Sequence, residues 1–338
     1  MTARAMIYGL AGTELSKDEH DFFRDADPWG FIVFARNIDT PKQLARLTMS
    51  LRDCVGRDAP VLVDQEGGRV RRLRPPNWRE MVAAEVYANL FKREPEAAIE
   101  AVWLNHRLMA EEMRAVGIDV DCVPCLDLRI PGADAIIGDR AFGETPEPII
   151  HLGRAAIEGV QAGGVAPIIK HIPGHGRADA DSHLELPVVE EEHELLSETD
   201  FAPFKALNDA VMAMTAHIVY RDIDPERPAT TSDVLVNQVI REEIGFDGLL
   251  MTDDLSMKAL TGTFRERGEA SIEAGCDLLL HCNGDPGEMR GVAEAAPEFA
   301  GKALERAQAA EAVREEIESF DACEGESRLN SLLELVSA

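Results

Sequence analysis

The sequence predicts an α/β protein, and more narrowly a single (β/α)8 barrel. Short apolar, β-branched segments recur along the 338 residues, and stretches with apolar residues at helical spacing, such as 40–55 and 95–117, separate them. This alternation is typical of a parallel sheet covered on both faces. Eight such segments between residues 5 and 282 fit a closed barrel better than an open sheet. The expected strands are residues 5–10, 30–37, 60–66, 118–128, 166–174, 212–220, 247–254 and 276–282.

We expect one domain over residues 1–338. A chain of this length buries about three quarters of its unfolded surface, so it needs no disulfide or metal to fold. The segment after residue 287 is rich in Ala and Glu. It is most simply the last barrel helix followed, from about residue 300, by a helical C-terminal extension.

Composition excludes several classes of partner. The 34 Lys and Arg against 62 Asp and Glu leave a net charge of −28, which opposes binding to nucleic acid or to an anionic membrane. The sequence has neither a run of roughly 18 apolar residues nor a secretory start, so we expect a cytoplasmic protein. Six cysteines are too few for a disulfide framework. Cys122 and Cys125 have the spacing of one half of a zinc site, but they lie in an expected strand, where their side chains would point to opposite faces. We therefore interpret them as buried thiols.

Polar or ionisable residues stand at the carboxyl end of nearly every expected strand. In barrels this rim carries the active site. One such residue could be a helix cap, but seven converging ends point to an enzyme. These residues are Arg36, Asn37, Asp64, Gln65, Glu66, Asp127, Lys170, His171, His217, Asp253, Asp254, His281 and Asn283.

The segment 170–187, KHIPGHGRADADSHLELP, is the richest in chemistry. We favour acid–base catalysis, in which His183 exchanges protons and Asp181 orients its imidazole. A metal site built on His175, Asp181 and His183 is an alternative, although the first strand lacks the paired His motif usual in metal-dependent barrel hydrolases. A solvated polar loop is the third interpretation.

Two further segments place charged groups at the rim. In MTDDLSM only one of the adjacent Asp253 and Asp254 can enter the barrel mouth, and Asp254 could cap the next helix, which leaves Asp253 for chemistry. In DQEGGRVRRL and GDRAFG, Asp64 stands near Arg72, and Arg140 adds a further cation. Carboxylates combined with Arg suit a polyhydroxylated ligand, although a structural ion pair is nearly as common.

These segments resemble glycoside hydrolase family 3, in particular the single-domain bacterial β-N-acetylglucosaminidases of peptidoglycan recycling. The resemblance spans roughly residues 6–290. Cys125 departs from it, at a position where an apolar residue is usual, and residues 77–95 match only loosely. The segments that carry it, in the family's order, are DQEGGRVRRL, GDRAFG, KHIPGHGRADADSH, MTAHIVYRDIDPERPAT and GLLMTDDLSM.

The resemblance implies a retaining exo-β-N-acetylglucosaminidase without a cofactor or metal, acting on N-acetylglucosaminyl peptidoglycan fragments in the cytoplasm, as a monomer. Asp253 would be the nucleophile, His183 the acid/base and Asp181 its partner. Many relatives carry a further domain that supplies an acid/base Glu, which this chain lacks, and His183 would take that role. The residues implied for the sugar pocket are Asp64, Arg72, Arg140, Lys170, His171 and His217.

Three rival functions stay open from the sequence. A glycoside phosphorylase would use phosphate in place of water at the same site. A metal-dependent hydrolase would use His175, Asp181 and His183. A non-catalytic barrel would bind the sugar and release no product.

Overall fold

The computed structural model describes residues 3–133, 135–178, 180, 182 and 185–337, and it forms a closed parallel barrel. The strands follow one another around the barrel in the order β1, β10, β9, β7, β5, β4, β3, β2 and back to β1. Their bounds are β1 (Arg4–Tyr8), β2 (Pro28–Val33), β3 (Val61–Val63), β4 (Val120–Asp121), β5 (Ala166–Ile172), β7 (Met212–Thr215), β9 (Leu249–Asp254) and β10 (Leu278–His281). Every expected strand segment overlaps one of them, so the predicted (β/α)8 fold is confirmed.

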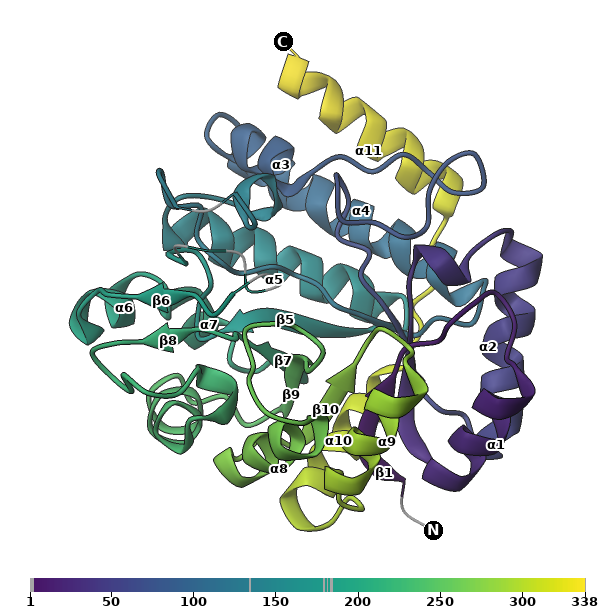
Figure 1. The fold of residues 1–338 in the computed structure, drawn as a ribbon. Helices are drawn as coiled ribbons and strands as arrows, with labels where there is room; N and C mark the ends of the chain where they lie inside the picture. Colours follow the sequence, from purple (N-terminus) through teal and green to yellow (C-terminus); the bar gives the residue numbers. More distant parts are fainter. Residues whose placement is uncertain (1–2, 134, 179, 181, 183–184, 338) are drawn as a thin grey trace.

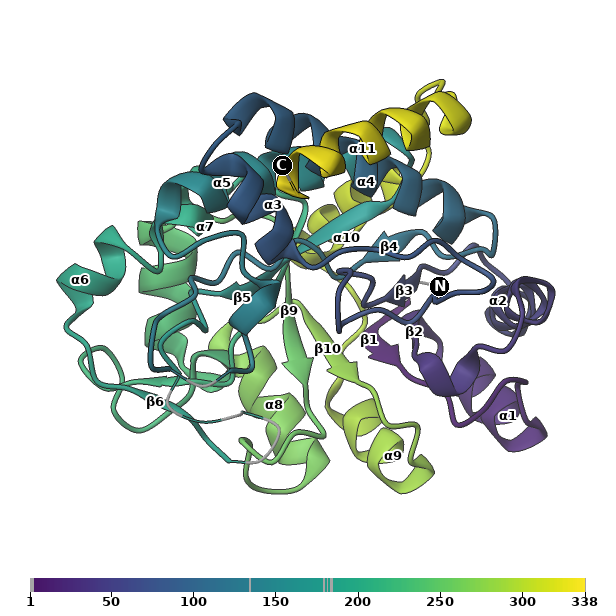
Figure 2. The same cartoon turned by 90° about the horizontal axis from the view of Figure 1, so that it is seen from above.

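Helices surround the barrel (Figures 1 and 2). A small sheet of β6 (Val188–Val189) and β8 (Val219–Tyr220) stands apart from the barrel strands. The α-helices are α1 (Lys17–Ala26), α2 (Pro41–Val55), α3 (Ala84–Phe91), α4 (Pro95–Arg114), α5 (Pro146–Ala162), α6 (His193–Glu198), α7 (Ala202–Ala206), α8 (Phe264–Ala274), α9 (Pro286–Ala295), α10 (Gly301–Val313) and α11 (Ala322–Ser337). Residues Ala35–Asn37, Gly138–Arg140 and Ala229–Thr231 form 3-10 helices. Residues Leu235–Glu243 form a π-helix.

Local sequence sets the helix ends, as α2 shows. The Thr40 side chain accepts a hydrogen bond from the Gln43 amide, and Pro41 occupies the first turn, where its missing N–H is not needed. Gly56 ends the helix with φ +66°, a conformation that glycine adopts without strain. Between these ends, the apolar side of the helix is buried against the barrel.

Strand β5 is buried along its whole length because helices cover the barrel and side chains fill it. Inside the barrel, apolar side chains such as Ile7, Leu62 and Ile168 form one core. Ala307 and Ala310 of α10 belong to the same core, so α10 closes the end of the barrel opposite the carboxyl ends of the strands. The predicted burial of Cys122 and Cys125 is confirmed.

The strand expected over 118–128 is much shorter in the structure. Only Val120–Asp121 pair as β4, and farther along Cys125 makes one isolated bridge to Lys170. The backbone between them passes through Pro124, which has no N–H to donate to a ladder. The freed segment instead brings Asp127 to the rim, where it meets the end of β5.

Candidate active site

A cavity of about 230 Å³ opens at the carboxyl end of the barrel. It is formed where β3, β5 and β9 end, together with the loops that follow them. The structure brings six of the predicted site residues to this cavity. They are Asp64, Arg72, Arg140, Lys170, His171 and Asp253.

One wall of the cavity is a network of alternating charges. The Lys170 Nζ lies 3.0 Å from Asp64 Oδ1 and 2.6 Å from Glu66 Oε1. Arg72 Nη2 donates to Asp64 Oδ2 at 2.9 Å. Arg140 donates two parallel hydrogen bonds to the Glu66 carboxylate, each 2.8 Å long. Such two-pronged pairs fix both partners in position. The wall is therefore a rigid set of donors and acceptors suited to sugar hydroxyl groups.

The cations of this network keep its carboxylates charged. Burial alone would raise the pKa values of Asp64 and Glu66, but Lys170 with Arg72 lowers that of Asp64, and Arg140 with Lys170 lowers that of Glu66 to about 2. Burial disfavours a charged Lys170, yet Asp64 and Glu66 raise its pKa. All of these groups thus carry charge at neutral pH.

Glu66 is a site residue whose importance the sequence analysis missed. It was noted only as one of several polar residues at a strand end. In an extended chain, side chains two positions apart face the same way, so Glu66 was placed to share the cavity with Asp64. Its partners Arg140 and Lys170 lie 74 and 104 positions further along the chain, and no local sequence pattern indicates these pairings.

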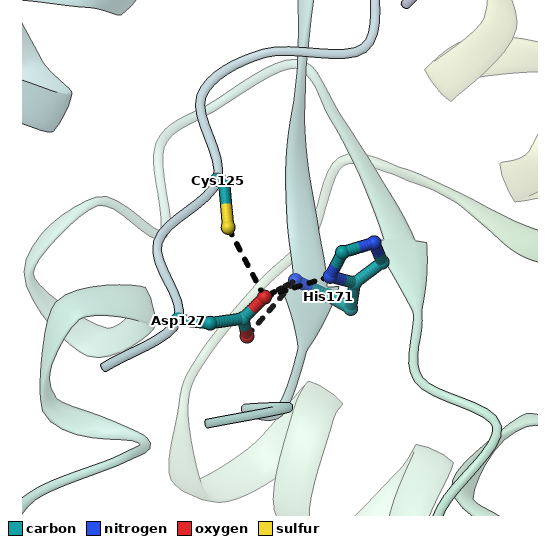
Figure 3. A group of neighbouring side chains, drawn as sticks. All are labelled: Cys125, Asp127 and His171. Atoms are coloured by element: carbon teal, nitrogen blue, oxygen red, sulfur yellow. Dashed lines mark hydrogen bonds and ion pairs between the residues drawn. The ribbon is translucent and has the colours of Figure 1, made fainter. Parts of the chain in front are cut away.

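His171 is held in one orientation by a carboxylate behind it (Figure 3). Its Nδ1 lies 2.7 Å from Asp127 Oδ2, which can only accept, so Nδ1 carries the proton. In the same view the other ring nitrogen points away from Asp127. Burial opposes the charge of Asp127, but the His171 side chain and the backbone amide of His175 keep its pKa well below the usual range. Asp127 thus orients the His171 ring.

Cys125 completes this buried cluster. Its Sγ lies 3.3 Å from Asp127 Oδ2, and the potential ligand atoms of Cys125, Asp127 and His171 all lie within 4.8 Å of one another. Burial raises the pKa of the Cys125 thiol well above its usual value, which disfavours the thiolate that a metal would need. Both Asp127 oxygens already accept hydrogen bonds. The cluster fits a hydrogen-bonded support better than a metal site.

The adjacent carboxylates at the end of β9 have different surroundings. Asp254 Oδ1 accepts hydrogen bonds from the amides of Ser256 and Cys282, each at 3.0 Å, and Oδ2 accepts one from the Ser256 hydroxyl. Asp254 therefore closes a turn. The expectation that it caps a helix is wrong, since α8 starts only at Phe264 and is capped by Thr263. Both Asp253 and Asp254 line the cavity, and Asp253 Oδ1 accepts a hydrogen bond from the Asp254 amide at 2.7 Å.

His217 lies behind the cavity wall and is absent from its lining. Its Nε2 is 3.1 Å from the Asp254 backbone oxygen and its Nδ1 is 2.7 Å from the Thr230 hydroxyl, so both ring nitrogens are engaged. Burial lowers the pKa of His217, which keeps the ring neutral. The structure thus gives His217 a position from which it supports the end of β9. Direct contact with a sugar stays a prediction.

Other polar strand ends serve local structure. The Asn37 amide donates to the backbone oxygens of Leu10 and Gly12, and His281 Nε2 lies 3.0 Å from Glu288. Neither residue lines the cavity. Strand position alone therefore overstated the number of residues available for chemistry.

The segment after β5 carries the predicted proton-transfer pair. Asp181 and His183 lie outside the described residues, so their positions stay expectations. His175 and Ser182 are described and line the cavity. Burial, with His171 adding to it, lowers the pKa of His175 to about 4, so its ring is neutral at neutral pH and unsuited to donate a proton.

In a comparison with known protein families, the family described as glycosyl hydrolase family 3 N terminal domain matches residues 8–314. The chain belongs to this family. It is therefore a glycoside hydrolase.

Relatives and solved structures of this family cover most of the chain. A beta-hexosaminidase from Alkalilimnicola ehrlichii is 40% identical over 285 residues, which are 82% of this chain and 80% of that protein. One from Methylococcus capsulatus is 39% identical, with 82% of each chain covered. NagZ from Neisseria gonorrhoeae in complex with N-trifluoroacetyl-D-glucosamine superposes with a TM-score of 0.88 at 30% identity, covering 98% of this chain and 99% of that one.

Proposed function

We propose that this glycosyl hydrolase family 3 member is a retaining exo-β-N-acetylglucosaminidase that removes terminal N-acetylglucosamine from peptidoglycan fragments. The relatives named beta-hexosaminidase and the NagZ complex with an N-acylated glucosamine support an amino-sugar substrate. The observation that carries the proposal is the placement of Asp253 in one cavity with the Asp64–Lys170–Glu66 network. A carboxylate thus stands beside rigid groups suited to hold a sugar.

The reaction takes two steps. In the first, an Asp253 oxygen bonds to the anomeric carbon while the bond to the leaving oxygen breaks and His183 protonates that oxygen. In the second, His183 takes a proton from water, the water oxygen bonds to the anomeric carbon, and Asp253 is released. Retaining enzymes commonly use two carboxyl groups, and a His with a reference pKa of about 6.5 can serve both steps near neutral pH.

The described groups act on binding and orientation. The charged wall of Asp64, Lys170 and Arg140 would hold the hydroxyl groups of the terminal sugar, and Asp127 would keep His171 turned toward it. Because ion pairs and hydrogen bonds fix these side chains before substrate arrives, little reorganisation accompanies the reaction.

Location and assembly are also proposals. Within the described residues, no helix has the length and apolar character needed to cross a membrane. A cytoplasmic monomer that acts on soluble peptidoglycan fragments follows from the family resemblance.

Trapping the covalent intermediate tests the proposal directly. We expect a 5-fluoro N-acetylglucosaminyl fluoride to label the peptide that contains Asp253, as seen by peptide mass spectrometry. A label on Asp254 or Glu66 would correct the nucleophile. If the protein binds N-acetylglucosamine but releases no product from a chromogenic β-glycoside, the binding-only barrel is the better description.

Product analysis separates the remaining rivals. Incubation of substrate with and without phosphate yields free N-acetylglucosamine if water is the acceptor, and the sugar 1-phosphate if phosphate is. Unchanged activity after chelation, with no metal found by elemental analysis, would argue against the metal-dependent hydrolase.

A further inference from the structure

We infer that His175 is a positioning residue that anchors Ser182, and through Ser182 the chain positions proposed to carry the acid/base pair. This inference deepens the proposed function and rests on it. It starts from a hydrogen bond between two buried side chains, His175 Nε2 and Ser182 Oγ, which lie 3.2 Å apart.

The His175 end of this contact is fixed by the barrel. The His175 amide donates to Asp127 Oδ1 at 2.6 Å, and the Tyr220 hydroxyl donates to the backbone oxygen of Gly174 at 2.6 Å. Gly176 passes so close to residue 128 that an added Cβ would lie 2.2 Å from the Leu128 backbone oxygen. The beginning of the loop is thus held by the segment after β4 and by β8.

The other end of the contact reaches the reaction site. Ser182 is only 3% exposed, and it lines the same cavity as Asp253 and His175. His175 and Ser182 are seven positions apart in the sequence, and this hydrogen bond joins their side chains. A side-chain bond of this kind restricts where the returning chain can lie.

The surroundings of the His175 ring favour a positioning role over a stabilising one. The ring is 3% exposed, and within the described residues its Nδ1 has no hydrogen-bond partner. A buried polar atom without a partner destabilises the fold, so an apolar residue would pack here at lower cost. The ring also faces His171 edge-on with 5.4 Å between centroids, which ties it to the substrate-binding wall.

Chain geometry carries the effect from Ser182 to its neighbours. In the sequence Ser182 stands between the two positions proposed for the acid/base pair, and consecutive Cα atoms are about 3.8 Å apart. In enzymes, a misplacement of about 1 Å can cost 10²-fold in rate. Loss of the anchor should therefore weaken proton transfer to the leaving group more than it weakens attack by Asp253.

This difference can be measured with two substrates. Phenyl β-N-acetylglucosaminide needs an acid to assist its leaving group, whereas the 2,4-dinitrophenyl glycoside hardly does. We expect Ser182→Ala to lower kcat/KM at least about tenfold for the phenyl substrate and less than about twofold for the dinitrophenyl one. His175→Ala should give the same pattern, and Ser182→Thr, which keeps a hydroxyl, should restore most of the loss.

Two controls separate positioning from general damage. Ser197→Ala removes a hydroxyl that bonds Glu243 outside the cavity, and it should leave both substrates unaffected. In the double variant of His175 and Ser182, the loss should not exceed the larger single loss, because both substitutions break one contact. Thermal unfolding of each variant verifies that the fold is intact.

The outcomes distinguish this inference from the proposed function. Equal losses for the two substrates in Ser182→Ala, or additive losses in the double variant, would overturn the anchor while leaving the glycosidase intact. A wild-type chain that hydrolyses neither substrate would overturn the proposed function and the anchor with it.

Discussion

At the scale of single residues, neighbours in the sequence take different tasks because their surroundings differ. Asp253 and Asp254 both line the cavity, but Asp254 also accepts three hydrogen bonds that close the turn after β9. Asp64 and Glu66 likewise share one lysine but pair with different arginines. Burial, charge and available donors decide each role, and residue type alone does not.

The adjacent carboxylates offer a matched pair of substitutions. We expect Asp253→Ala to abolish nearly all turnover because it removes the proposed nucleophile. Asp254→Asn keeps the shape of the side chain and should retain measurable activity with a lower melting temperature, since it weakens the turn. Steady-state kinetics and thermal unfolding of both variants check this. Normal activity in Asp253→Ala would remove the basis of the proposed mechanism.

Replacement of the proposed acid/base is the next test. His183→Ala should slow turnover of substrates with poor leaving groups by about 10²–10⁴, the usual contribution of a positioned acid or base. The bell-shaped dependence of kcat/KM on pH should also lose one of its two sloping sides, because one titrating group is removed. Kinetics within twofold of wild type would transfer the role to another residue.

Glu66 should make stability depend on pH in a defined direction. Its folded pKa of about 2 lies below the value of about 4.3 for an unfolded glutamate. Its ion pairs therefore add stability above pH 5, on the order of 3 kcal/mol, and lose it as the pH falls toward 2.

Urea unfolding measures this effect as the difference between wild type and Glu66→Gln. We expect the difference in unfolding free energy to shrink by roughly 1–2 kcal/mol between pH 5 and pH 3, because only the wild type has this group to protonate. A difference that stays constant over this range would mean that Glu66 is not held charged by Lys170 and Arg140.

At the scale of elements, the ends of strands and the loops after them place the chemistry. Strand β5 delivers Lys170 and His171 to the rim, and the loop that follows returns Ser182 to the same cavity. The segment after β4 supports this loop through Asp127 and Leu128. Close backbone approach at Gly176 and hydrogen bonds to Asp127 together set the path of the beginning of the loop.

Gly176 tests that close approach. Gly176→Ala would place a Cβ 2.2 Å from the Leu128 backbone oxygen, so the loop must shift. We expect at least about a tenfold loss of kcat/KM while the barrel stays folded. Gly12→Ala is the matched control, because a Cβ there meets nothing within 4 Å, and it should leave kcat/KM unchanged. Equal kinetics for the two variants would show that the loop tolerates displacement.

At the scale of the whole molecule, the reaction site and the C-terminal helices occupy separate parts of the fold. Helix α10 closes the opposite end of the barrel, and α11 lies along α4 (Figures 1 and 2). No residue of α10 or α11 lines the cavity within the described residues. These helices should therefore govern stability with little effect on catalysis.

Substitutions on α11 measure that separation. Leu332 is 3% exposed, so Leu332→Ala should lower the free energy of unfolding by about 2–5 kcal/mol without changing KM. Leu335→Ala, three residues along on an exposed position, should change stability by less than about 0.5 kcal/mol. A changed KM in Leu332→Ala would connect α11 to the substrate site.

The sequence by itself determined the barrel and the location of its rim. Strand and helix periods are local properties, and a parallel sheet with both faces covered needs apolar strands, so 166–174 and 247–254 were recognisable as strands. The two carboxylates of MTDDLSM and the charged groups of DQEGGRVRRL were identified for the same reason, because they follow such strands. Their family pattern then supplied expected roles.

Only the tertiary structure decided which polar groups meet. Glu66 pairs with Arg140, which is 74 positions away in the sequence, and Asp127 orients His171, which is 44 positions away. No local sequence pattern predicts pairings over such separations. The same holds for His217, whose two nitrogens are taken by Thr230 and by the end of β9. Pairing among buried polar groups depends on barrel closure, which brings distant strand ends together and lets most buried donors and acceptors find a partner.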